Sequence, residues 1–81
     1  MKKNHIVVLT NGFVYHGTIE ITDGWIAIRD AKNIRRWGTK RGLGELALHG
    51  PTKETVMDEV GFVQAPLTSL VHLIECQHEA S

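Results

Sequence analysis

The chain has 81 residues, a formal net charge of zero and 42% hydrophobic residues, which together predict one folded domain over residues 1–81 and exclude wholesale disorder. A neutral total argues against a protein that coats DNA with its whole surface. No stretch is apolar for long enough to cross a bilayer or to act as a signal peptide, and a single cysteine excludes an intrachain disulfide, so we expect a cytoplasmic protein without a membrane partner.

Residues 6–21 predict two antiparallel strands joined by a hairpin. The first is a short apolar run over residues 6–9, and Asn11-Gly12 after it is a strong signal for a two-residue turn. Residues 13–21 then alternate between two faces, which is the pattern of a half-buried strand. One face carries Phe13, Tyr15, Gly17, Ile19 and Ile21, and the other carries Val14, His16, Thr18 and Glu20.

A second turn at residues 23–24, Asp-Gly, leads into a third strand over residues 25–29. Ile26 and Ile28 face the expected core in this strand, which leaves Trp25 on the opposite side. An indole off the core face is available to a ligand or to another subunit.

The chain after the third strand has a less regular pattern. Asp30 is a typical N-cap residue, so we expect a short helical turn over residues 32–36 that ends at Gly38. Residues 38–52 are rich in glycine and predict an irregular segment with a short apolar piece at residues 46–48.

The last third of the chain predicts further strands. Residues 55–57 are a brief candidate, residues 60–65 are a stronger one that Pro66 ends, and residues 70–76 form the last. This last strand is apolar on both faces, so we expect cover on both, with a neighbouring subunit as one source of it. The elements together predict an all-β fold, a small five-stranded antiparallel barrel with a Gly-rich, basic insertion between strands 3 and 4.

Residues 6–28 resemble the Sm-like family, and in particular its bacterial Hfq-like branch. Residues 63–74 resemble the last two short strands of that family, with Pro66 near the sharp bend. The resemblance covers roughly half of the chain and implies an Sm-like (SH3-like) small barrel. The matching positions in the first part are Leu9, Asn11, Gly12, Gly17, Ile19 and Asp23.

The same resemblance implies an oligomeric ring that binds single-stranded RNA. The family places an aromatic residue or a methionine two residues after the aspartate, where it stacks a nucleobase beside the pore of the ring, and that position is Trp25 here. Gln64 and Ala65 stand where the family carries a Lys-His or an Arg-Gly pair, so the usual base-side and phosphate-side donors are absent. The alternative for Trp25 is packing against Trp37 or against a neighbouring subunit.

Residues 33–44, NIRRWGTKRGLG, gather four cations around one indole. Residues 29–41 hold six cations and one acid, a local charge of +5, whereas residues 42–81 hold one lysine and six acids, a charge of −5. Arginine grips phosphate with paired hydrogen bonds, an indole offers a face to a base, and glycines let backbone N–H groups approach an anion. The segment therefore predicts a site for a nucleotide-type anion, with the candidate ligand-binding residues Trp25, Arg35, Arg36, Trp37, Thr39, Lys40 and Arg41.

The alternative is that these cations pair with the acidic half of the chain, within one subunit or between subunits. We expect no enzymatic activity and no cofactor, because the histidines are scattered along the chain. Cys76 and His78 have the only spacing that suggests a metal, close to the C-terminus, and His72 beside Cys76 is typical of ordinary packing.

Residues 33–52 also resemble a family of small bacteriophage proteins, which suggests a phage origin and a place in the host cytoplasm. Three hypotheses follow. The first is a non-enzymatic homo-oligomer that binds a nucleotide-type anion, which in a phage would be a sponge for a host immune second messenger. The second is an Sm-like ring that binds single-stranded RNA, and the third is a structural module or one that interacts with a host protein.

Overall fold

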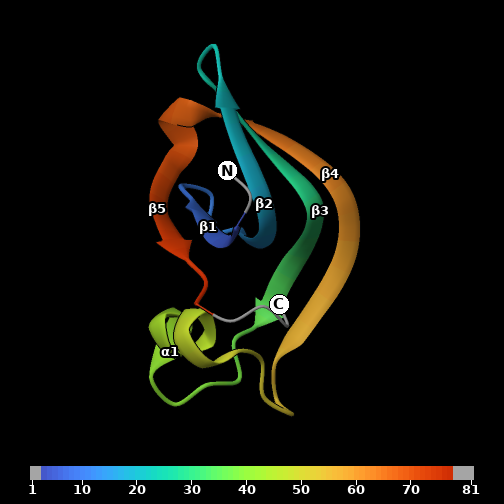
Figure 1. Ribbon diagram of the computed structural model, residues 1–81, viewed down its shortest axis with the longest axis vertical. Coiled ribbons are helices and arrows are strands. Elements are labelled where there is room, and N and C mark those ends of the chain that lie inside the picture. Colours follow the sequence, from blue (N-terminus) through green and yellow to red (C-terminus); the bar gives the residue numbers. More distant parts are fainter. Residues whose placement is uncertain (1–2, 78–81) are drawn as a thin grey trace.

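The computed structural model describes residues 3–77, which form one sheet of five antiparallel strands and one short helix (Figure 1). The strand order is β4-β3-β2-β1-β5, so β4 and β5 lie at the two edges. This arrangement confirms the predicted all-β fold with an insertion between its third and fourth strands. The elements are β1 (Asn4–Leu9), β2 (Val14–Thr22), β3 (Trp25–Arg36), α1 (Gly42–His49), β4 (Val56–Pro66), the 3-10 turn Leu67–Ser69 and β5 (Leu70–Glu75).

The sheet curls strongly, so that its inner face wraps around a core (Figure 1). The neighbours Ile6 and Val7 are both 0% exposed, which means that β1 is covered on both faces. Val7 belongs to the core inside the curl, and Ile6 belongs to a second cluster that α1 covers. The first cluster is Val7, Leu9, Ile19, Ile26, Ile28, Ala31 and Ala65, and the second is Ile6, Val14, Ile34, Leu46, Ala47 and Cys76.

The two predicted hairpin turns are present, and the first is one residue longer than expected. Its loop holds residues 10–12, closed by bonds from Leu9 N–H to Phe13 O and from Gly12 N–H to Leu9 O, each 3.0 Å. Gly12 has a φ of 87°, as the last residue of a three-residue hairpin loop requires. In the second turn both residues 23–24 have positive φ, and two such residues form the type I′ turn that Asp-Gly favours.

The predicted helical turn over residues 32–36 is wrong, because β3 continues through this stretch to Arg36. Asp30 has a φ of 53° and lies in a bulge, where β3 holds one residue more than β2 between two cross-strand pairs. The bulge shifts the alternation, so that Ala31 and Ile34 are buried. Their burial in the two clusters outweighs the capping preference of one aspartate.

The segment around α1 and β4 also differs from the expectation. Residues 42–49, predicted to be irregular, form α1, because burial of Leu46 and Ala47 supports a helix there. The brief strand at 55–57 and the stronger one at 60–65 are one continuous β4, which passes an irregularity at Gly61 with a φ of 87°. Within residues 3–77, the only helix, α1, lacks the length and apolarity needed to span a membrane.

The last strand receives its cover from the chain itself. Leu70 and Leu73 pack against the inner core, whereas Ile74 packs against the cluster under α1. An irregularity in the pairing with β1 explains the change of face, and it leaves Val71 exposed. The expectation of cover on both faces is therefore met only in part: the curl and the cluster under α1 half-bury Leu70, Leu73 and Ile74, and no residue of β5 is fully buried.

Gly17 lets β2 pass close to the bulge of β3. A Cβ atom at this position would lie 2.7 Å from the carbonyl oxygen of Arg29 and 2.7 Å from a methyl group of Ile28. We expect Gly17→Ala to lower the free energy of unfolding by about 1–3 kcal/mol, as overpacking does. Gly44→Ala is the control, because the space around Gly44 in α1 is open and alanine favours a helix by about 0.5–1 kcal/mol. Urea denaturation of both variants measures the difference, and equal effects would contradict the close approach.

Candidate functional site

The two tryptophans lie at opposite ends of β3. Trp25 is the first residue of this 12-residue strand, and Trp37 follows its last residue. Figure 1 shows β3 running along most of the molecule. The alternative that Trp25 packs against Trp37 is therefore wrong within one chain, and one small ligand cannot contact both indoles of the same subunit.

Two of the cations around Trp37 form ion pairs with acids of the second half of the chain. The Nε atom of Arg35 contacts Oδ2 of Asp58 on β4, and the guanidinium of Arg36 lies 3.7 Å from Glu54, just before β4. This is the pairing within one subunit that the charge pattern offered as an alternative to an anion site. All four side chains are half-exposed or more, so these pairs are weak.

Two threonine hydroxyls fix the loop of the basic segment, the name that we use for residues 33–44. The hydroxyl of Thr39 donates to Gly42 O at 2.5 Å, and the hydroxyl of Thr55 donates to Trp37 O at 2.6 Å. The ring of Trp37 faces Gly42, where an added Cβ atom would lie 3.8 Å from it. These contacts give Thr39 and Trp37 structural roles, although the indole remains 44% exposed.

Gly38 allows the loop after β3 to pass close to the backbone of Glu54 and Thr55. A Cβ atom on it would lie 2.3 Å from the carbonyl carbon of Glu54, and its φ is 67°. Thr52 fixes the same contact, because its hydroxyl donates to Gly38 O at 2.6 Å. This glycine is therefore required by the backbone of the loop, whether or not an anion binds nearby.

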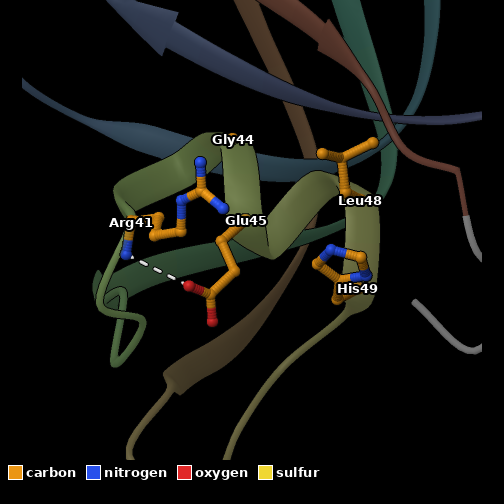
Figure 2. Close-up of a pocket in the computed structure, with 5 residues that line it drawn as sticks. All are labelled: Arg41, Gly44, Glu45, Leu48 and His49. Atoms are coloured by element: carbon orange, nitrogen blue, oxygen red, sulfur yellow. Dashed lines mark hydrogen bonds between the residues drawn. The ribbon is translucent and has the colours of Figure 1, made fainter.

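Of the four cations in residues 33–44, Lys40 and Arg41 form no ion pair within residues 3–77. The backbone N–H of Arg41 donates to a carboxylate oxygen of Glu45 at 3.1 Å. A shallow hollow of about 270 Å³ lies beside them on the outer side of α1 (Figure 2). Its lining residues are spaced three or four apart and so share one helix face: Arg41, Gly44, Glu45, Leu48 and His49.

A second hollow, of about 250 Å³, lies on the outer face of the sheet around Ala27. The pairing of β2, β3 and β4 places its side chains in three rows across the strands. We call this surface the Ala27 hollow. The first two rows are Thr22, Trp25 and Pro66, then Glu20, Ala27 and Gln64. In the third, Thr18 pairs with Arg29, and Phe62 lies against Arg29 where the pairing of β3 with β4 is irregular. All of these residues but Thr18 and Pro66 line the hollow.

The small side chain of Ala27 creates this hollow, because larger residues stand in the rows before and after it. Trp25 is 49% exposed on one side, and Phe62 is 51% exposed on the other. The guanidinium of Arg29 lies 5.0 Å from the centre of the Phe62 ring and 3.7 Å from Glu20. A flat group can rest on Ala27 with an aromatic surface at either end.

Sequence reasoning found one part of the Ala27 hollow and missed the rest. The alternation of residues 25–29 put Trp25 on the outer face, and the structure places it there. Phe62 and Gln64 come from a strand far away in the sequence, and only the register of β3 with β4 brings them beside Ala27. Asp23, in the preceding turn, also lines the hollow.

A third hollow, of about 420 Å³, lies where the irregular parts of β3 and β4 face each other. It is lined by Asp30, Lys32, Glu59 and the two small residues Ala31 and Gly61. Its charges are mixed and no aromatic ring lines it, so it offers less to a planar ligand than the Ala27 hollow.

The spacing of Cys76 and His78, which we did not expect to form a metal site, cannot be examined, because His78 lies outside the described residues. Cys76 itself is buried in the cluster under α1. Within residues 3–77, no three His, Cys, Asp or Glu side chains are arranged to hold a metal ion.

Comparison with models of protein families, with curated proteins and with solved structures found no match to this chain. A function for this fold therefore has to rest on the geometry of its own surfaces.

We expect the ion pairs of Arg35 and Arg36 to contribute little to stability. The double variant Arg35→Gln and Arg36→Gln should lower the free energy of unfolding by about 0–2 kcal/mol in low salt, and by less in 1 M salt, because exposed pairs are weak and screened. Urea denaturation at both salt concentrations checks this. A loss that is large and independent of salt would mean that the arginine stems, rather than their charges, hold the loop to β4.

The thiol of Cys76 should resist modification in the folded protein. Burial, with a smaller contribution from the charge of Glu75, raises the pKa of this thiol above its ordinary value. The neutral form is therefore favoured on folding, and this contribution to stability is complete below about pH 8.5 and is lost as pH rises through the folded pKa. We expect slow reaction with a disulfide reagent at pH 8 and fast reaction in 8 M urea, followed by absorbance. Equal rates would contradict the burial of Cys76.

Proposed function

We propose that the protein is a non-enzymatic binding module for a nucleotide-type ligand, whose base lies on Ala27 and stacks against Trp25. The observation that carries this proposal is the Ala27 hollow, with a half-exposed indole at one end and the Phe62 ring under Arg29 at the other. Stacking of a base on an aromatic side chain contributes about 1–3 kcal/mol. The resemblance of residues 6–28 to the Sm-like family independently points to Trp25.

The size of the hollow favours one base rather than a whole nucleotide. Its volume of about 250 Å³ is below the range of about 300–1,000 Å³ typical of pockets that enclose a small molecule. The sugar and phosphate then remain outside the hollow. A base in the hollow could belong to a free nucleotide or to a single-stranded RNA. Binding experiments with both kinds of ligand distinguish these two possibilities.

The charges around the hollow support recognition of the base more than of the phosphate. Arg29 is its one cation, and Glu20 and Asp23 are its acids. The basic segment lies at the far end of β3, where two of its arginines already have carboxylate partners. Trp25 therefore stays in the proposed site, whereas Arg35, Arg36, Trp37, Thr39, Lys40 and Arg41 form a separate region.

Binding without turnover amounts to sequestration of the ligand. If the chain has the phage origin that residues 33–52 suggest, we propose that the sequestered nucleotide is a signal made by the host. Native mass spectrometry of freshly purified protein reports both the number of subunits and the mass of any retained nucleotide, so it is the first measurement to make.

The two tryptophans provide a matched test of the proposed site. We expect Trp25→Ala to weaken binding by roughly 5- to 150-fold, the equivalent of one base–aromatic stack, and Trp37→Ala to leave it unchanged. Isothermal titration with AMP, CMP, GMP and UMP, and with ten-nucleotide RNAs of single base composition, measures both variants against the parent protein.

The outcomes separate the competing functions. Loss of binding on Trp37→Ala alone would place the ligand at the basic segment and overturn the proposed site. RNA that binds far more tightly than mononucleotides, with a steep dependence on salt, would identify RNA as the ligand. No binding of any probe would leave an interaction with a protein as the function to test.

A further inference from the structure

We infer that the Ala27 hollow selects guanine, with Glu20 and Gln64 reading opposite edges of the base; this inference rests on the proposed function. The two side chains flank Ala27 in the same row of the sheet. Glu20 is the cross-strand partner of Ala27 on β2, and Gln64 is its partner on β4. Both line the hollow.

The dimensions of the sheet suit a base held between these two side chains. Neighbouring strands lie about 4.8 Å apart, so the backbones that carry Glu20 and Gln64 are separated by roughly 10 Å with Ala27 midway. A base with one face against Trp25 then spans the three strands. One edge of it meets the carboxylate, and the other meets the amide. The side chains of Glu20 and Gln64 are both exposed, so both are free to contact a ligand in the hollow.

The chemistry of a carboxylate distinguishes the four bases. An ionised glutamate only accepts hydrogen bonds. Guanine presents two adjacent donors on its Watson–Crick edge, N1–H and the N2 amino group. Adenine and cytosine present a donor beside an acceptor, and uracil presents one donor between two carbonyl oxygens. Only guanine therefore gives Glu20 two hydrogen bonds and no opposed lone pair.

Gln64 adds recognition on the opposite side of the base. Its amide nitrogen is a donor, and N7 of guanine is an acceptor on the edge away from N1. Arg29 lies next to the Glu20 carboxylate: its guanidinium is 3.7 Å from Oε1 while it rests on Phe62, so the two side chains form a weak, exposed ion pair. Glu20 and Gln64 together therefore match a planar ligand that has hydrogen-bond donors on one edge and an acceptor on the opposite edge.

The acids of the hollow give a further expectation. Glu20 and Asp23 together outnumber the single cation Arg29, so added phosphates gain little from this site. Guanosine, which is uncharged, should bind about as tightly as GMP. A site built to recognise phosphate would instead favour GMP strongly.

The test compares Glu20→Gln with Glu54→Gln. Glu54 is a matched control, because it forms an ion pair with Arg36 at the same 3.7 Å as Glu20 with Arg29, and both carboxylates are similarly exposed. Isothermal titration uses GMP, AMP, CMP, UMP and guanosine. We expect the parent protein and Glu54→Gln to bind GMP at least roughly tenfold more tightly than UMP, as a paired hydrogen bond to one base edge implies, and Glu20→Gln to lose this preference. Circular dichroism confirms that each variant is folded.

The results separate a failure of guanine selection from a failure of the proposed nucleotide-binding function. Equal affinity for all four nucleotides, still reduced by Trp25→Ala, would overturn guanine selection while the proposed function stands. A guanine preference that Glu20→Gln retains would overturn the assignment of Glu20. Absence of binding by every nucleotide and by guanosine would overturn both the inference and the function beneath it.

Discussion

The burial of β1 on both faces is the constraint on which the rest of the structure depends. Ile6 and Val7 are adjacent and point in opposite directions, yet neither is exposed. A flat sheet of five strands cannot cover both. The sheet therefore curls to enclose Val7, and the chain must supply a separate element over Ile6. That element is α1, and the segment between β3 and β4 exists first of all to deliver it. Gly38, Thr39 and Thr52 contribute to this by fixing the loop that leads from β3 into α1.

The bulge at Asp30 lets one strand serve both cores. Before it, β3 turns Ile26 and Ile28 inward, and after it Ala31 and Ile34 are buried in different clusters. The outward positions before the bulge are left with a tryptophan, an alanine and an arginine. The Ala27 hollow is therefore a direct product of strict alternation in the first half of β3. The same bulge shifts the alternation before the basic end of β3, so the Ala27 hollow and the cations around Trp37 lie in separate parts of the molecule.

The sequence predicts those features that depend on neighbouring residues. The Asp-Gly turn and the outward position of Trp25 each follow from a few adjacent positions. The predicted half-buried pattern of residues 13–21 is wrong in part, because Val14, which belongs to the second cluster, and His16 are both buried, whereas Phe13 and Ile21 are exposed. The prediction of a helical turn at residues 32–36 is wrong, because the burial of Ala31 and Ile34 favours a bulged strand there. The capping preference of Asp30, which forms the bulge, gives no sign of this. α1 was missed for a similar reason, since its glycines hide a helix that burial of Leu46 and Ala47 supports. The roles of Phe62 and Gln64 could not be predicted, because only the pairing of β3 with β4 brings these distant residues to the Ala27 hollow.

The fold also brings the two oppositely charged parts of the chain together. The basic segment and the acidic half of the chain look like opposite patches in the sequence, but antiparallel pairing of β3 with β4 brings them together. Arg35 contacts Asp58, Arg36 lies near Glu54, and on the other side of β3 Arg29 lies near Glu20. Three of the six cations in residues 29–41 thus already have a carboxylate neighbour within the fold. The charge available to attract a phosphate is reduced by these pairs. The indole of Trp25 is half-exposed and can stack, whereas Arg29 already rests on the ring of Phe62. Under the proposed function, a ligand of the Ala27 hollow would therefore be selected by its ring and by the hydrogen-bonding pattern of its edges.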